Sequence, residues 1–393
     1  MALADFRARL VAPTVVLFLA LLAAQAAVLV LTPILVEVAH DFGVSTSAAG
    51  QVRTLTGLVA GVSALAVGRV FRGVALRDLL LGGAGLLALG SLLSAAAPSF
   101  TVFVLAQVPV GVAIAVLVSS GAAAAGEWAQ PGGGNRLLSS TLLGPPMAWV
   151  IGMPLVGIAA ERSWRLGFLV FPLLASLVVA VALSMCRKER LPEVRPLVRL
   201  RDLLGDPIVG SWALAELLAS SAWAGTLVYA GALFVESYDA SPLLAGLVLA
   251  AGAVAYLPGN ILAEHLLRRR PALDVLPLIA LLGAAGVIVF GVVRPSAAVS
   301  AVVFAALAFV MAGRTLSGSA LGLELAPDRR LAVMGLRAAG LQFGYLVGSA
   351  AGGLALVAGG YPALGALLGS FCVAAAATYV VLRMRWVPVA ASA

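Results

Sequence analysis

The sequence predicts an all-α membrane protein with twelve transmembrane helices in two pseudo-symmetric six-helix halves, and three observations support this fold class. The composition is 62% hydrophobic and 11% charged, whereas soluble domains average about 45–50% and about 25%. Polar surface cannot cover so apolar a chain, and most of it must therefore face lipid. The apolar residues form long segments between short polar loops, and the longest polar stretch falls at the midpoint of the chain.

The apolar segments are long enough to cross a bilayer as helices. A spanning helix needs about 20 apolar residues, because its backbone polar groups must all be satisfied within the segment. In the first half, the segments that meet this requirement are residues 12–38, 47–68, 76–97, 101–126, 137–160 and 165–186. In the second half they are residues 209–236, 242–267, 272–293, 297–324, 331–358 and 361–383. Three pairs of neighbours are separated only by short turns, which are Ala97-Pro98-Ser99, Arg294-Pro295-Ser296 and Gly359-Gly360-Tyr361.

The basic residues predict the orientation of these helices. With the N-terminus inside, 20 of the 25 lysines and arginines fall in loops on the cytoplasmic side, which is the distribution that the positive-inside rule describes. Arg337, near the start of the eleventh segment, is counted among them, whereas Arg53 and Arg294 belong to the other side. We therefore expect a multi-pass protein of the cytoplasmic (plasma) membrane with its N- and C-termini inside.

A basic stretch from about Arg187 to Pro207 divides the chain. It contains Pro192, Pro196 and six basic residues. We expect an N-terminal six-helix half over residues 1–186, a cytoplasmic linker over 187–208 and a C-terminal six-helix half over 209–393. Two such halves are typical of secondary transporters built from structural repeats.

The loop between the second and third segments carries a motif. It reads Gly68-Arg69-Val70-Phe71-Arg72-Gly73-Val74-Ala75-Leu76-Arg77. This resembles the loop 2–3 signature of the major facilitator superfamily, glycine-x-x-x-Asp-Arg-x-Gly-Arg-Arg. Gly68 and Arg77 match the signature, whereas Arg72 replaces its aspartate; in the equivalent loop of the second half an acid is present as Glu264.

The fifth segment carries a stronger resemblance. Its residues Gly144-Pro145-Pro146 and Gly152-Met153-Pro154, followed by Trp164-Arg165, resemble the helix 5 signature of the drug:proton antiporter and sugar-efflux branch. The resemblance implies alternating access. It also implies conformational or gating roles for Gly68, Arg72, Arg77, Glu127, Gly144, Pro145, Gly152, Pro154 and Glu264. This branch usually has an arginine in helix 4, where Gln107 stands here, and this departure puts coupling through that position in doubt.

Few large polar side chains lie inside the predicted helices, and such residues are costly enough to be functional candidates. In the fold that the resemblance implies, helices 1, 4, 7 and 10 line a central cavity, and these helices carry Gln25, Gln107, Glu216 and Arg314 respectively. With Trp223 and Gln342, these four residues are the candidate substrate-binding set. Glu216 is the only acid deep in a segment, and it is the candidate proton-coupling group. Glu216 and Arg314 could instead form a structural ion pair, and both interpretations stay open.

The predicted function is therefore secondary active transport of a small or amphipathic organic compound by alternating access, as proton-coupled efflux. The alternatives are an uncoupled facilitator, an importer of a sugar or organic anion, and a non-transporting sensor. No nucleophile–base set indicates an enzyme, and His40 and His265 are too isolated to indicate a metal site. We expect no cofactor other than a proton as coupling ion. The basic residues lie in loops without interleaved aromatics, which does not favour nucleic acid; we expect a monomer whose partners are its small-molecule substrate and the lipid bilayer.

Overall fold

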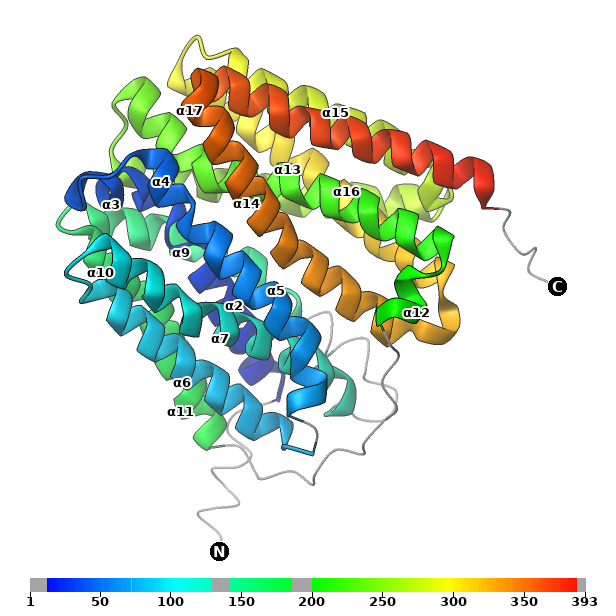
Figure 1. Cartoon of the computed structure of the whole chain (residues 1–393), viewed down its shortest axis with the longest axis horizontal. Coiled ribbons are helices and arrows are strands. Elements are labelled where there is room, and N and C mark those ends of the chain that lie inside the picture. The colour runs from blue at the N-terminus through cyan, green and yellow to red at the C-terminus, as the bar shows by residue number, and fades with distance from the viewer. Residues whose placement is uncertain (1–12, 72, 129–136, 138–140, 186–199, 387–393) are drawn as a thin grey trace, which may run out of the picture. The chain divides into compact units, whose positions relative to one another are not determined.

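The computed structural model describes residues 13–71, 73–128, 137, 141–185 and 200–386. These residues are almost entirely helical, and none of them lies in a β-strand (Figure 1). The fold class predicted from the sequence, an all-α membrane protein, is confirmed.

The first half contains long helices, some of them interrupted by short turns. Pro33 lies in a 3₁₀ turn, Thr32–Ile34, inside the first apolar segment. Pro172 lies in a π-helical turn, Leu169–Leu173, inside the sixth. The helices are α2 (Pro13–Leu29), α3 (Leu35–Asp41), α4 (Thr46–Gly50), α5 (Val52–Val70), α6 (Leu76–Ala95), α7 (Phe100–Glu127), α9 (Gly144–Ala160), α10 (Trp164–Phe168) and α11 (Leu174–Ser184).

The second half begins with a short helix and ends with a long, broken one. Its helices are α12 (Leu200–Leu204), α13 (Pro207–Tyr238), α14 (Pro242–Leu267), α15 (Ala272–Val292), α16 (Ala297–Leu325) and α17 (Arg330–Arg385). Within α17 the backbone leaves the helical conformation at Gly359 and Gly360, where Gly360 has φ +64°. Glycine adopts this left-handed conformation without a steric penalty, and the turn predicted at Gly359-Gly360-Tyr361 is found there.

Each predicted apolar segment is helical over most of its described residues. In the described part of the chain, ten helical stretches are long and apolar enough to cross a membrane, and α9 is a shorter apolar helix. One of the ten, over 332–385, contains the glycine break and so holds the two last predicted segments. This arrangement is consistent with twelve transmembrane helices.

Serine caps explain where several helices begin. The side chain of Ser99 accepts a hydrogen bond from the backbone N–H of Val102 at the start of α7, and Ser296 accepts one from Val299 at the start of α16. Such caps satisfy N–H groups that have no partner inside the helix. Both serines end a predicted turn that also contains a proline, so these short loops stop one helix and start the next.

The chain forms two compact units. The first comprises Met1–Pro196 with Leu227–Ala253, and the second comprises Leu197–Thr226 with Val254–Ala393. The helices α13 and α14 therefore contribute residues to both units. The predicted division into halves at residues 187–208 stays a prediction, since 186–199 lie outside the described residues.

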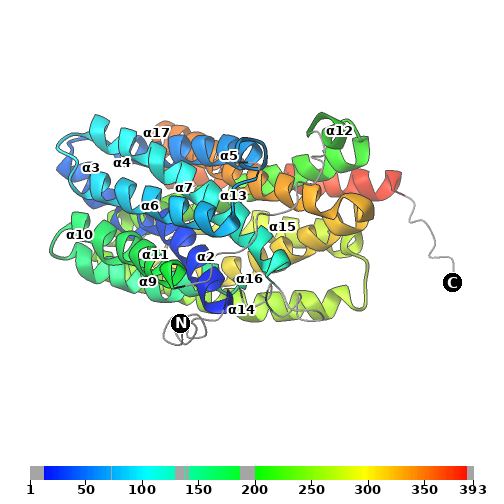
Figure 2. The ribbon, with the colours of Figure 1, turned by 90° about the horizontal axis from the view of Figure 1, so that it is seen from below.

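Within the first unit, α6 packs against α7 and α11, and α9 packs against α2 (Figures 1 and 2). One end of this bundle is held by Arg165 of α10. Its guanidinium donates to the carbonyl oxygens of Ala95 and Ala97 at 2.9 and 2.7 Å and pairs with Asp41 at 3.0 Å. The guanidinium also lies over the Trp164 ring, 4.6 Å from its centroid. One side chain thus ties the end of α3 to the α6–α7 turn.

Within the second unit, α15 packs against α16 and against α17 (Figure 1). Near one end of these helices, Arg383 of α17 pairs with Asp274 of α15 at 2.8 Å. The core around the start of α13 contains the fully buried Trp212 and Tyr379. These two aromatic side chains border the polar network described next.

Candidate functional site

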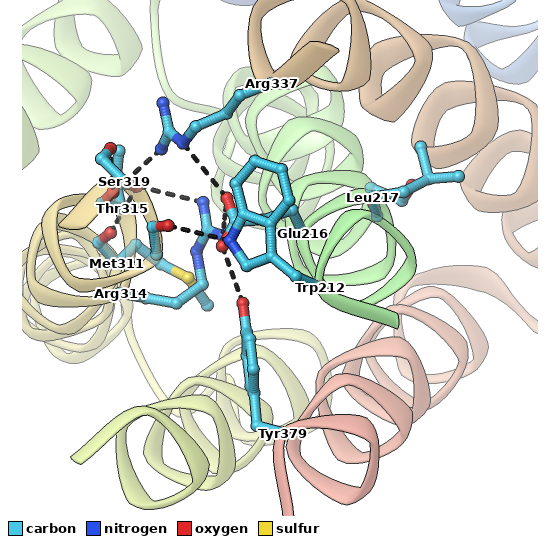
Figure 3. A network of polar contacts seen from close by, with 11 residues as sticks. Trp212, Glu216, Leu217, Met311, Arg314, Thr315, Ser319, Arg337 and Tyr379 are labelled. Atoms are coloured by element: carbon cyan, nitrogen blue, oxygen red, sulfur yellow. Dashed lines mark hydrogen bonds and ion pairs between the residues drawn. The ribbon is translucent and has the colours of Figure 1, made fainter. Parts of the chain in front are cut away.

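Glu216 of α13 is the centre of a buried polar network in the second unit (Figure 3). Its side chain is 5% exposed. Oε2 of Glu216 lies 3.1 Å from Nη1 of Arg314 on α16 and 3.3 Å from Nε of Arg337 on α17. The Tyr379 hydroxyl, beyond the break in α17, donates to Oε1 at 2.7 Å. One carboxylate of α13 therefore contacts residues of α16 and of both segments of α17.

Two glycines of α16 make room for the side chains of Glu216 and Trp212. A Cβ atom on Gly318 would come within 1.9 Å of Oε1 of Glu216, and one on Gly322 would come within 2.4 Å of the Trp212 ring. The Trp212 indole also donates to the carbonyl oxygen of Gly318 at 2.9 Å. Residues four apart lie on one face of a helix. A large pair on α13 thus packs onto a small pair on α16, as close helix packing in membranes requires.

Thr315 supports both arginines. Nη2 of Arg314 donates to the Thr315 hydroxyl at 3.1 Å, and that hydroxyl donates to the carbonyl oxygen of Met311 at 2.8 Å. Nη2 of Arg337 donates to the Thr315 carbonyl oxygen at 2.9 Å. The side chain of Arg314 is 2% exposed and that of Arg337 is 20% exposed. Arg314 is therefore enclosed, whereas Arg337 forms the accessible side of the network.

The ionised network carries more positive than negative charge. One carboxylate faces two guanidinium groups, which leaves a net charge of one positive unit. Buried charges are costly unless they are paired and hydrogen-bonded. The Glu216 carboxylate meets this condition, because Arg314, Arg337 and the Tyr379 hydroxyl all contact it. The two guanidinium groups, however, share the same oxygen, Oε2.

The predicted substrate-binding residues fall in different places. Glu216 and Arg314 form the ion pair that was one of the two interpretations of the sequence. Trp223 stacks on Phe304 of α16, with ring centroids 6.0 Å apart. Gln342 of α17 is buried, and its Oε1 has no hydrogen-bond partner among the described residues. Substrate binding by any of these residues stays a prediction.

The other two candidates lie in the first unit. Gln25 is half-buried on α2. Gln107 is buried on α7, and its Nε2 donates to the Ser94 hydroxyl of α6 at 2.9 Å. Its amide thus joins two neighbouring helices, and a contact between Gln107 and substrate stays a prediction.

The predicted gating residues also differ in their surroundings. Nε of Arg77 donates to the carbonyl oxygen of Leu183 at 3.0 Å, which joins the start of α6 to the end of α11. Glu264 is exposed and pairs at 2.6 Å with Arg268, in the turn that follows α14. Gly68 and Glu127 lie near the ends of α5 and α7, and Arg72 lies outside the described residues. The gating roles stay predictions.

The helix 5 signature corresponds to close packing of α9. A Cβ on Gly144 would come within 2.5 Å of the Phe18 carbonyl oxygen of α2, and one on Gly152 within 2.0 Å of the Phe171 ring. Pro145 lies in the first turn of α9, where proline is tolerated, and Pro154 lies inside the helix. Their roles in a conformational change stay predictions.

Sequence reasoning missed two members of the network. Arg337 was counted with the cytoplasmic loop charges, yet it lies two turns inside α17 and contacts Glu216. The rule that singled out Glu216, an ionisable residue two turns inside an apolar segment, applies equally to Arg337. Tyr379 carries no comparable signal, because nothing in the sequence distinguishes a hydrogen-bonding tyrosine from one that only packs. Arg53, counted with the outer charges, is buried in α5.

Comparisons with known proteins agree with this architecture. The profile of the Major Facilitator Superfamily matches residues 17–321 and 236–393. A relative from Bacillus subtilis, the "Uncharacterized MFS-type transporter YbcL", is 26% identical over 153 residues, and the matched region covers 39% of this chain and 39% of that protein. The chain thus spans well under half the length of this relative.

Several solved structures share the fold over nearly the whole chain. A bacterial homologue of the human lysosomal transporter Spinster has a TM-score of 0.75 and 15% identity and covers 96% of this chain and 98% of its own. A D-xylose-proton symporter has a TM-score of 0.75 and 17% identity, covering 93% and 96%. The nucleoside transporter NupG has a TM-score of 0.73 and 12% identity, covering 94% and 100%. These likenesses concern the fold alone. Because the profile extends from residue 17 to the last residue, the chain belongs to the Major Facilitator Superfamily.

Proposed function

We propose that this protein is a secondary transporter that moves a small organic compound across the cytoplasmic membrane by alternating access, coupled to protons through Glu216. Membership of the superfamily and a chain of repeated membrane-length helices support the transport function. The observation that carries the coupling is the buried Glu216 carboxylate, through which α13 is joined to α16 and to both segments of α17. A change in its charge therefore acts on all of these elements at once.

The physical basis of the coupling is the loss of charge on protonation. A proton on Glu216 removes the negative partner of both Arg314 and Arg337. Ion pairs are strong where water is scarce, and a buried charge that loses its partner is destabilising. The two guanidinium groups must then find other partners or more water. A packing arrangement that provides either is favoured in the protonated state, and this links proton binding to conformation.

Two directions of transport have support. The helix 5 residues Gly144, Pro145, Gly152 and Pro154 resemble those of efflux proteins, which favours export. The second candidate is an importer of an organic anion. It is favoured by the presence of two arginines on one carboxylate, because the excess positive charge suits an anionic substrate.

The test is proton movement in proteoliposomes driven by added compounds. Purified protein would be reconstituted with an internal pH-sensitive dye, and ethidium, D-xylose, uridine and benzoate would be added under an imposed pH gradient. We expect at least one compound to drive a proton flux that Glu216→Gln abolishes. Glu161→Gln, which removes the same charge from an exposed acid, is the matched control. A compound-driven proton flux that persists in Glu216→Gln contradicts the proposed coupling.

A further inference from the structure

Two guanidinium groups, those of Arg314 and Arg337, share the single carboxylate of Glu216. We propose that Arg337 and Arg314 bind the carboxylate or phosphate group of an anionic substrate, and that Glu216 occupies this site when the substrate is absent. The inference rests on the proposed transport function for the identity of its ligand as a substrate. Its geometry and its test concern binding alone.

The charges around the two arginines leave this site under-neutralised. Among the described residues, Glu216 is the only carboxylate within ion-pair distance of Arg314 or Arg337. The other titratable groups that act on Arg314 are Tyr379 and Cys372 of α17 and Tyr256 of α14. Phenol and thiol side chains of this kind are ordinarily neutral near pH 7. None of them supplies the missing negative charge.

The hydrogen-bond donors of the arginines are also under-used. Nε of Arg314 is buried and has neither a hydrogen-bond partner nor an ion-pair partner among the described residues. Nη1 of Arg314 and Nε of Arg337 both depend on one atom, Oε2 of Glu216, at ion-pair distance. Buried donors are normally satisfied, and each exception calls for an explanation. A guanidinium matches a carboxylate or phosphate with two parallel hydrogen bonds. A ligand with such a group would supply the acceptors that one oxygen of Glu216 does not.

Access to the site favours exchange at Arg337. The side chain of Arg337 is 20% exposed, whereas Arg314 is 2% exposed and held by Thr315. A ligand that arrives at Arg337 meets an arginine that only Glu216 neutralises. Arg337 is therefore the first contact, and Arg314 is reached once the Glu216 carboxylate moves away.

The same geometry links the anion to a proton. Glu216 competes with the anion only while it is ionised, so a proton on Glu216 favours anion binding and a bound anion favours the proton. Linkage of this kind is reciprocal. Proton and anion would consequently travel together, and an inward proton gradient would drive uptake of an anionic compound. A cationic substrate would show the opposite linkage.

The experiment measures binding of matched probes to the purified, detergent-solubilised protein. The probes are benzoate, phenyl phosphate and the neutral benzamide, studied by thermal shift and by calorimetry in buffers of different ionisation enthalpy. We expect at least one of the two anions to bind and benzamide not to bind. Binding by the wild type should tighten at least about tenfold between about pH 7.5 and about pH 5.5, with proton uptake, because protonation removes the competing carboxylate.

Two variants distinguish this proposal from a merely structural role of the network. Arg337→Gln should weaken anion binding at least about tenfold, since a charge-assisted bidentate contact is lost. Glu216→Gln should bind the anion at least as tightly as the wild type and should lose the pH dependence. Arg383→Gln, which removes an arginine whose ion pair with Asp274 lies outside the network, is the control and should behave like the wild type.

Three outcomes overturn the proposal: neither anion binds to the wild type or to Glu216→Gln, benzamide binds as tightly as the anions, or Glu216→Gln abolishes anion binding while its thermal stability is retained. The result is separable from that of the flux experiment. Anion binding without any proton-coupled flux would leave this site standing and contradict the transport proposal. A Glu216-dependent flux of a neutral or cationic compound, without anion binding, would contradict the anion site and leave the transport proposal standing.

Discussion

At the scale of single residues, the three charges of the network differ in depth, and this difference predicts what the loss of each costs. Arg314→Gln leaves the Glu216 carboxylate with only the partly exposed Arg337 and the Tyr379 hydroxyl. Removing one partner of a buried ion pair costs about 3–5 kcal/mol of stability. Arg337→Gln should cost clearly less, because Glu216 keeps the enclosed Arg314. Thermal unfolding of the purified variants measures the difference.

A double variant checks the cause of this loss. Glu216→Gln combined with Arg314→Gln also removes the carboxylate that Arg314→Gln alone leaves behind. The double variant should therefore lose less stability than the sum of the losses of the two single variants. Additive losses, or an Arg337→Gln variant as unstable as Arg314→Gln, would show that the arginines stabilise the fold through packing and not through Glu216.

The sequence identified part of this network for a physical reason. Glu216 and Arg314 lie inside long apolar segments, where the cost of an ionised side chain makes each conspicuous. Arg337 lies close enough to a predicted helix end to be counted as a loop charge. The Tyr379 contact depends on how the last helix segment packs against α13, and no local pattern encodes that.

At the scale of helices, the packing of α13 against the first segment of α17 depends on small residues. A Cβ on Gly348 would come within 2.1 Å of the Ser221 carbonyl oxygen and 2.7 Å of the Gly225 nitrogen, both of which are backbone atoms that a side-chain rotation cannot move away. Gly348→Ala should therefore destabilise the protein by about 1–3 kcal/mol, the usual cost of overpacking. The measurement is the thermal unfolding midpoint.

The same helix provides the control for this prediction. A Cβ on Gly340 would meet nothing within 4 Å. Gly340→Ala should leave stability unchanged or raise it by up to about 1 kcal/mol, the gain in helix propensity. If both alanine variants lost stability equally, the cost would come from glycine's backbone properties in α17 and not from close contact with α13.

Arg165 gives a second prediction at this scale, because it joins elements that are distant in sequence. Its planar guanidinium donates to the carbonyl oxygens of Ala95 and Ala97 and pairs with Asp41. Lysine keeps the charge but lacks the fork of donors. Arg165→Lys should therefore lose about 2 kcal/mol, the value of hydrogen bonds to a charged group. Arg162→Lys, at an exposed position in the turn before α10, should lose nothing in the same unfolding assay.

Helix positions were the most predictable feature of the fold. Long apolar segments must be helical in lipid. The turns between them contain the serines that cap the next helix and the glycine whose backbone has a positive φ. The fifth segment, predicted over residues 137–160, is helical at residues 137 and 141 as well as in α9. A turn at residues 142 and 143 precedes α9, which begins at Gly144 with Pro145 in its first turn, where proline is tolerated.

At the scale of the whole molecule, the sequence indicates which segments are helices but not which helices pack together. The residues of α13 up to Thr226 belong to the second compact unit, whereas those from Leu227 onward belong to the first. Both portions are apolar and helical, so hydropathy cannot separate them. Assignment to a unit depends on close contacts such as that of Gly231 with the carbonyl oxygen of Thr32, and those contacts arise from tertiary packing.

The orientation of the chain is a property of the whole molecule that charge alone predicts. The two prolines on either side of α15, Pro271 and Pro295, are exposed and lie at opposite ends of one membrane-length helix. The predicted topology assigns 20 of the 25 basic residues, Arg337 among them, to the cytoplasmic side. On this prediction the end that follows Arg268, Arg269 and Arg270 should face the cytoplasm. The other end should face outward.

Cysteine labelling measures this orientation directly. In a background with Cys186 and Cys372 replaced by alanine, Pro295→Cys should react with a membrane-impermeant maleimide in intact cells. Pro271→Cys should react only after the membrane is opened, and the cysteine-free parent should not react at all. Because α15 has one end on each side, an inverted chain would exchange the two results. Labelling of Pro271→Cys in intact cells would thus overturn the predicted topology, and with it the expectation that both termini are inside.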